Sequence, residues 1–188
     1  VSFMHPSFPS IRDVFAALLL ALLMPTVAFA EESNVQRSPR ATVSLVSEYA
    51  AVSPGQKVRI GLRQRLAPHW HTYWKNPGDA GSPPNIEFNL PEGATVGEID
   101  WPGPDRFIIG PVASYGYSNE IVFPMTLSVP QGAQPGSQLL IEANADWVVC
   151  EKECIPEEGK FRLILPVEAN ARPASAAIRA AFGIADAR

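Results

Sequence analysis

The stretch that decides the fold is Lys57–Arg63 (KVRIGLR), in which apolar and charged side chains alternate. Val58, Ile60 and Leu62 lie on one side of an extended chain, and the charged side chains lie on the other. An alternation with a period of two residues predicts a β-strand with one face buried and one face in water. The rest of the chain repeats this pattern in short segments.

Seven further segments predict strands: Thr42–Tyr49, Trp70–Trp74, Ile86–Leu90, Thr95–Ile99, Ile121–Val129, Gln138–Val149 and Lys160–Val167. Turn sequences such as Ser53–Gly55 (SPG) separate them. Because no amphipathic helical segment lies between the strands, a βαβ fold is disfavoured and an antiparallel β-sandwich is predicted. Only the tail predicts a helix, with Pro173 in its first turn, Ala176–Phe182 as its body and Gly183 at its end.

The first thirty residues predict a secretory signal peptide. Val14–Met24 is an unbroken apolar run, preceded by Arg12 and followed by the small-x-small sequence Ala28–Ala30. A membrane helix needs roughly 20 apolar residues, so the run is too short for one, although an uncleaved N-terminal anchor is the alternative. We therefore expect a signal peptide at 1–30, a flexible lead-in at 31–40, a folded domain at 41–168 and a helical tail or linker at 169–188.

Composition excludes several functional classes. Apolar residues make up 46% of the 188 residues, which is enough for a core and argues against general disorder. The net charge is −4 and no run of basic residues occurs, so a nucleic-acid partner is not expected. No nucleophile elbow, phosphate-binding loop or Ser-His-Asp order is present. Export would place the chain in an oxidising compartment, where a cysteine pair forms a disulfide for part of its life.

The cysteine pair, Cys150 and Cys154, lies between two predicted strands. In the chain-entropy model, a disulfide across five residues constrains the unfolded state by only about 2 kcal/mol, against about 4.7 kcal/mol for a 100-residue loop. The pair is therefore better suited to exchange than to bracing the fold. Glu151 and Glu153 disfavour a thiolate, so a relay is expected rather than a potent nucleophile. A permanent structural disulfide and a metal site are the alternatives.

A second candidate feature is His69-Trp70-His71. Two histidines at i and i+2 of a strand point to the same face, so a copper or zinc pair is geometrically possible. Histidines packed among aromatic side chains are the favoured interpretation, and no cofactor is expected. The tyrosines Tyr73, Tyr115 and Tyr117 are likewise expected to fill the core and edges rather than to form a carbohydrate or peptide groove.

The segment His69–Gly81 (HWHTYWKNPGDAG) resembles the N-terminal periplasmic domain of the DsbD family of thiol:disulfide interchange proteins, closest to its ScsB-like branch, which is linked to copper tolerance. Trp101-Pro102 and Tyr115–Tyr117 resemble the segment that carries the cap loop of that domain. Cys150 and Cys154–Glu157 (CIPE) resemble its redox pair. The resemblance extends from about residue 41 to residue 167.

The resemblance implies an immunoglobulin-like sandwich that relays electrons in the periplasm. The cysteines would accept them from a membrane-embedded DsbD-like donor and reduce oxidised periplasmic thioredoxin-fold proteins, such as disulfide isomerases or cytochrome c maturation factors. Each transfer would pass through a mixed disulfide, which we assign to Cys154, with Cys150 as the resolving thiol. An aromatic cap would shield the pair, and Tyr115 and Tyr117 are the candidates by position.

Three features depart from the family pattern. The spacing between the cysteines is shorter than in better-known members, and Pro111–Ser114 replaces acidic residues that precede the cap in some of them. The chain carries neither the membrane domain nor the thioredoxin-like domain, so we expect a fragment of a longer protein or a free-standing version. Two other functions stay open: a module that binds copper through His69 and His71 or docks a partner through its aromatics, and an inert structural domain.

Overall fold

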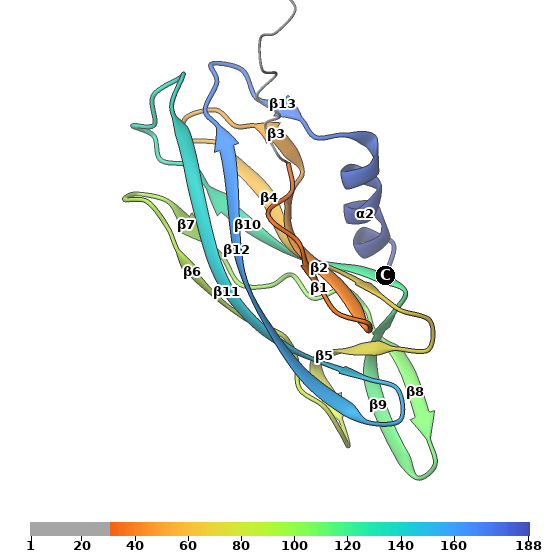
Figure 1. The fold of residues 1–188 in the computed structure, drawn as a ribbon. Coiled ribbons are helices and arrows are strands. Elements are labelled where there is room, and N and C mark those ends of the chain that lie inside the picture. The colour runs from red at the N-terminus through yellow and green to blue at the C-terminus, as the bar shows by residue number, and fades with distance from the viewer. Residues whose placement is uncertain (1–30) are drawn as a thin grey trace, which may run out of the picture.

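The computed structural model describes residues 31–188 as two antiparallel β-sheets packed face to face, with one helix against the first sheet (Figure 1). The expected immunoglobulin-like sandwich with a short C-terminal helix is thereby confirmed. The signal peptide predicted at 1–30 lies outside the described residues. Within 31–188, no helix has the length and apolar character needed to cross a membrane.

The first sheet has the strand order β1-β2-β4-β10-β7. Its strands are β1 (Gln36–Arg37), β2 (Ala41–Ser47), β4 (Lys57–Leu66), β10 (Glu120–Ser128) and β7 (Thr95–Val96). A separate short pair joins β3 (Tyr49–Ala51) to β13 (Arg172–Pro173). In β4, the alternation of the KVRIGLR segment appears as predicted, since Val58, Ile60 and Leu62 are buried.

The second sheet has the order β12-β11-β5-β9-β8, with β6 also paired to β11. Its strands are β12 (Cys154–Pro166), β11 (Gln138–Cys150), β5 (His71–Gly78), β9 (Val112–Ser118), β8 (Asp105–Ile109) and β6 (Asn85–Asn89). Strands β11 and β12 form a hairpin of thirteen residues a side, paired continuously from Gln138↔Pro166 to Cys150↔Cys154. This long hairpin carries the cysteines to one end of the sandwich.

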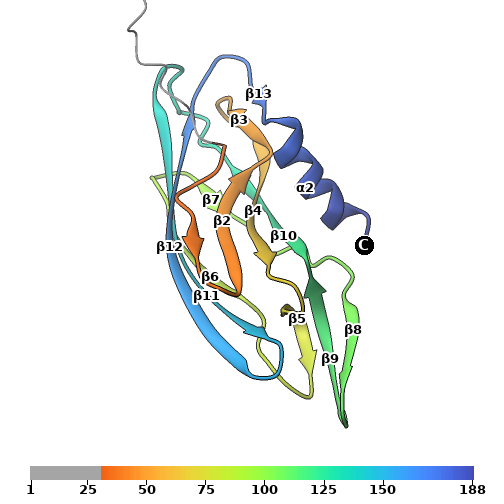
Figure 2. The same cartoon turned by 45° about the vertical axis from the view of Figure 1, so that its right-hand side comes forward.

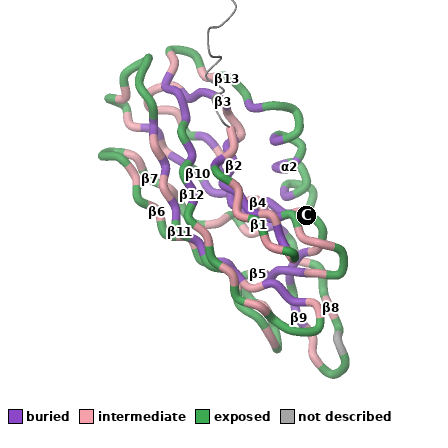
Figure 3. The backbone as a smooth tube through the Cα atoms, viewed as in Figure 1, coloured by how far each residue is buried: buried purple, intermediate pink, exposed green. Residues whose placement is uncertain are grey.

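The core lies between the two sheets, and buried segments, purple in Figure 3, occur along strands of both sheets. Apolar side chains from both sheets meet there, among them Leu45, Ile60, Leu62, Phe123, Ile141, Phe161 and Leu163, all at most 1% exposed. Burial of this apolar surface is the main stabilising contribution to the sandwich. The end of the molecule that bears β8 and β9 extends beyond this core (Figure 2).

The expectation of a flexible lead-in at 31–40 is wrong, because backbone and side-chain hydrogen bonds attach this segment to the sandwich. Strand β1 pairs with β2, and the Ser33 N–H donates to the carbonyl of Leu45. Asn34 bonds the exposed edge of β12 twice, through Nδ2 to the carbonyl of Lys160 and through Oδ1 from the N–H of Arg162. The segment therefore covers part of an edge strand.

The C-terminal helix α2 (Ala176–Asp186) packs its apolar face, which includes Ile178 and Phe182, toward β10. The Ser175 side chain caps it by accepting a hydrogen bond from the N–H of Ile178. The predicted end of the helix at Gly183 is wrong. The helix continues to Asp186, because the buried residue Ala185 extends the apolar face past the glycine. Pro173 belongs to β13 rather than to the first turn of the helix.

Candidate functional site

The cysteines form the last opposed pair of the β11–β12 hairpin, at the end where the chain turns. Cys150 is the final residue of β11 and Cys154 is the first residue of β12, and residues 151–153 make the turn. Their Cα atoms are 4.2 Å apart and a disulfide joins the two side chains. The register of the hairpin, rather than the disulfide alone, places the two sulfur atoms side by side.

The two cysteines differ in their exposure to solvent. Cys150 is only 3% exposed, because its strand continues into the sheet and pairs with β5 at His71. Cys154 is exposed, because β12 is the edge strand of the sheet. A partner that approaches from solvent therefore meets Cys154, while Cys150 lies behind it.

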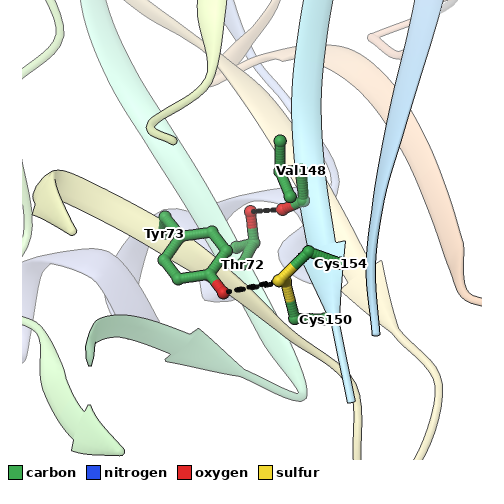
Figure 4. The surroundings of a disulfide bond; sticks show 5 residues. All are labelled: Thr72, Tyr73, Val148, Cys150 and Cys154. Atoms are coloured by element: carbon green, nitrogen blue, oxygen red, sulfur yellow. Dashed lines mark hydrogen bonds between the residues drawn. A yellow bond between two sulfur atoms is a disulfide. The ribbon is translucent and has the colours of Figure 1, made fainter. Parts of the chain in front are cut away.

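Tyr73 contacts the disulfide directly (Figure 4). Its hydroxyl donates a hydrogen bond to Cys150 Sγ at 2.8 Å and lies 3.4 Å from Cys154 Sγ. The side chain is 1% exposed, and burial raises the pKa of the Tyr73 hydroxyl above its ordinary value of 10. The phenol therefore stays protonated near neutral pH and acts as a hydrogen-bond donor to the sulfur.

The loop after β5 fixes the Tyr73 ring. Gly81 adopts a φ of +88°, which favours glycine, and a Cβ atom at this position would overlap the Tyr73 ring. His71, two residues before Tyr73, packs against the same ring edge-on at a centroid distance of 5.3 Å. These contacts give a physical reason for glycine at the end of the HWHTYWKNPGDAG segment.

His71 is 4% exposed and stacks on Phe107 of β8, with ring centroids 4.7 Å apart and planes at 16°. Burial lowers the pKa of the His71 imidazole, so the ring is neutral at pH 7. The alternative of a His69–His71 pair on one strand face is not supported, because His69 precedes β5 with a φ of +74°. Residues 31–188 contain no group of three or more His, Cys, Asp or Glu side chains that could hold a metal ion.

The β8–β9 hairpin lies beside β5 and is attached to it closely. The Asp79 carboxylate accepts from the N–H of Ala113 at 2.9 Å, and the Asp79 N–H donates to the carbonyl of Ala113, also at 2.9 Å. A Cβ atom at Gly116 would overlap the carbonyl of Thr72, so glycine permits the close approach of β9 to β5. The hairpin thus presents Phe107 to His71, the neighbour of Cys150 in the sheet.

The two tyrosines expected to cap the disulfide have other surroundings. The hydroxyl of Tyr117 donates to the carbonyl of Pro102 at 2.7 Å, and its buried ring packs edge-on against Phe123. Tyr115 is 37% exposed and lies opposite Arg106, on the other side of the hairpin from Phe107. The aromatic side chains that the structure brings to the cysteines are therefore Tyr73 and, through His71, Phe107.

The glutamates near the cysteines are not equivalent. The Glu157 carboxylate is nearly buried, and it accepts hydrogen bonds from Arg40 at 2.7 Å and from the Trp147 indole at 3.1 Å. It therefore secures the hairpin to the neighbouring segment. Lys152 and Glu153 in the turn are exposed, so charges of both signs lie beside Cys154.

Sequence reasoning did not single out Tyr73, Phe107 or Thr72 as site residues. The alternation in the WHTYW segment places His71 and Tyr73 on one side of a strand, and this was the sequence signal that could have pointed to Tyr73. No local pattern indicates that this strand pairs with the end of β11, because Tyr73 and Cys150 are 77 residues apart.

Comparisons with known proteins agree with this site. The sequence profile described as "Thiol:disulfide interchange protein DsbD, N-terminal" matches residues 42–166. Among solved structures, the N-terminal periplasmic domain of ScsB from Proteus mirabilis is 25% identical with a TM-score of 0.58. The match covers 84% of this chain and 58% of that structure's chain.

A weaker structural match is the GAE domain of yeast GGA1, with 9% identity and a TM-score of 0.38 over 70% of this chain and 97% of that one. A search with the sequence against curated proteins finds no match. The profile match covers most of the chain and includes both cysteines of the disulfide. The chain therefore belongs to the family of DsbD N-terminal domains, whose chemistry is thiol:disulfide interchange.

Proposed function

We propose that this protein is a periplasmic electron relay that accepts reducing equivalents from a membrane-embedded DsbD-like donor and passes them to oxidised thioredoxin-fold proteins. One observation carries the proposal: a disulfide between an exposed residue, Cys154, and a buried residue, Cys150, whose Sγ accepts a hydrogen bond from Tyr73. The periplasmic location is supported by the predicted signal peptide and by the periplasmic origin of the similar ScsB domain.

The difference in exposure supports a different role for each sulfur. A donor thiolate attacks Sγ of the exposed Cys154, the Cys150–Cys154 bond breaks, and its electron pair moves to Cys150 Sγ. The donor's second thiolate then attacks the donor sulfur of the mixed disulfide, which releases Cys154 as a thiolate and leaves the donor as a disulfide. Two electrons have passed to the cysteine pair, and the reverse sequence passes them on to an oxidised protein.

Tyr73 favours the first of these steps because its hydroxyl already donates to the sulfur that leaves as a thiolate. Hydrogen bonds to charged groups contribute about 1.5–3 kcal/mol. That energy corresponds to about one to two pKa units for the Cys150 thiol. A lower thiol pKa makes a better leaving group, so attack at Cys154 is favoured over attack at Cys150.

The β8–β9 hairpin is our candidate for the cap of the site. Phe107, on the side of the hairpin that faces β5, stacks on His71, and Asp79 bonds the backbone of Ala113. Tyr115, on the other side, is exposed and available to a docked partner. Moving the hairpin away from β5 would break the stack and uncover His71, the neighbour of the buried Cys150.

The experiment that tests the proposal is the redox equilibrium of the protein in glutathione buffers, measured by thiol alkylation and mass spectrometry. We expect a midpoint between about −180 and −230 mV, the range of exchange proteins. Cys150→Ser should then trap partners on Cys154, with Cys154→Ser as the matched control. A midpoint below about −300 mV would indicate a permanent structural disulfide and overturn the proposal.

A further inference from the structure

Thr72 is fully buried between the strands that carry Tyr73 and Cys150. Its Oγ1 hydroxyl donates a hydrogen bond to the carbonyl of Val148 at 3.2 Å, and Figure 4 shows this bond beside the disulfide. Strand β11 lies between β12 and β5, and Thr72 bonds it from the side of β5.

The junction that this bond spans is short. In the part of the chain that the structure describes, β5 and β11 share one register pair, Cys150↔His71, whereas β5 also pairs with β9 at His71, Thr72 and Tyr73. Tyr73 is thus held firmly to β9, but its strand has little backbone pairing to the strand that carries Cys150. The Thr72–Val148 hydrogen bond adds a second attachment two residues from the cysteine.

We propose that Thr72 is a positioning residue for disulfide exchange, an inference that rests on the proposed role of Tyr73. When a partner thiolate bonds to Cys154 Sγ, the Cys150–Cys154 bond breaks and the electron pair leaves on Cys150 Sγ. The disulfide between the ends of β11 and β12 is then lost, and only the turn at residues 151–153 connects them. The Thr72–Val148 bond keeps the end of β11 against β5, so the Tyr73 hydroxyl remains on the Cys150 thiolate.

The test measures the acidity of Cys150 in the Cys154→Ser background, where one thiol titrates alone, by thiolate absorbance against pH. Tyr73→Phe should lower the acid dissociation constant of Cys150 by about tenfold or more. Thr72→Val, which keeps the shape and removes the hydroxyl, should lower it by roughly threefold. Thr72→Ser, which keeps the hydroxyl, should leave the acid dissociation constant of Cys150 close to that of the protein with Thr72. Thr126→Val, at an exposed position of β10, is the matched control and should leave it unchanged.

A double-variant cycle separates positioning from a general structural role. If Thr72 acts through Tyr73, then Thr72→Val should not change the acidity of Cys150 further in the Tyr73→Phe background. An equal effect in both backgrounds would overturn the inference, as would an unchanged Cys150 acidity in Thr72→Val when Tyr73→Phe shows its effect. No effect of Tyr73→Phe would overturn both the leaving-group role and this inference. Thr72→Ala removes the same hydroxyl and takes the place of Thr72→Val if that variant does not fold.

Discussion

Reduction of the Cys150–Cys154 disulfide should lower the free energy of unfolding only slightly, although this bond is the centre of the chemistry. The bond closes a loop of five residues from Cys150 to Cys154, and the chain-entropy model gives a loss of only about 2 kcal/mol in the free energy of unfolding. Because the β11–β12 hairpin pairs thirteen residues a side, the strands should stay in register without the bond. For a domain of this size, that loss corresponds to a fall in Tm of about 4–8 °C.

The assay is urea and thermal unfolding of the oxidised protein and of the protein held reduced by a phosphine, followed by circular dichroism and tryptophan fluorescence. The variant with Cys150→Ser and Cys154→Ser provides a reduced-state control that cannot re-oxidise. Equal m-values for the states would show that the native fold is retained. A reduced protein that is unfolded at 25 °C, or that loses more than about 4 kcal/mol, would refute the reasoning, because the bond would then be a structural brace.

Three further predictions follow from the site. Each cysteine can be alkylated alone in the variant that lacks the other. Iodoacetamide should alkylate Cys154 in Cys150→Ser at least about tenfold faster than Cys150 in Cys154→Ser, as followed by mass spectrometry. Equal alkylation rates would contradict the difference in exposure. Burial lowers the pKa of His71, so the unfolded state binds the proton first as the pH falls below about 6.5 and stability decreases there. His71→Phe should remove that part of the pH dependence in urea unfolding at pH 5 and pH 7.5, and the same slope in both proteins would contradict the assignment. Gly81→Ala should destabilise the fold by about 1–3 kcal/mol in thermal unfolding, because Gly81 has a positive φ and its new Cβ would overlap the Tyr73 ring. Gly132→Ala is the control and should have little effect, because a Cβ atom there meets open space. Similar losses of stability in both variants would argue against the packing of Gly81 on Tyr73.

Local patterns predicted most of the sandwich but little of its long-range pairing. The alternation in β4 and the long apolar periodicity of β11 depend on neighbouring residues alone, so these strands could be predicted. Strands β8 and β9 were not predicted, because Asp105–Ile109 (DRFII) lacks alternation and becomes a strand only by pairing with β9. Local patterns and propensities carry no information on such a pairing.

The same limit applies to the site. The cysteines could be assigned from their spacing and from the family resemblance, and the structure brings them together as a disulfide. His69 could not be placed, since a non-glycine residue with positive φ leaves no signal in the strand pattern. Tyr73 became a site residue through the meeting of β5 with the end of β11, which depends on the whole sheet.

The opposed register of the hairpin also bears on oxidative damage. If a peroxide converts the exposed Cys154 to a sulfenic acid, the thiol of Cys150 faces it from the adjacent strand. Condensation of the two forms the disulfide and releases water, which returns the cysteines to the Cys150–Cys154 disulfide state. Because this step is intramolecular, it competes well with a second peroxide, whose attack would give an irreversible sulfinic acid. The exposed sulfur is therefore protected by its buried neighbour.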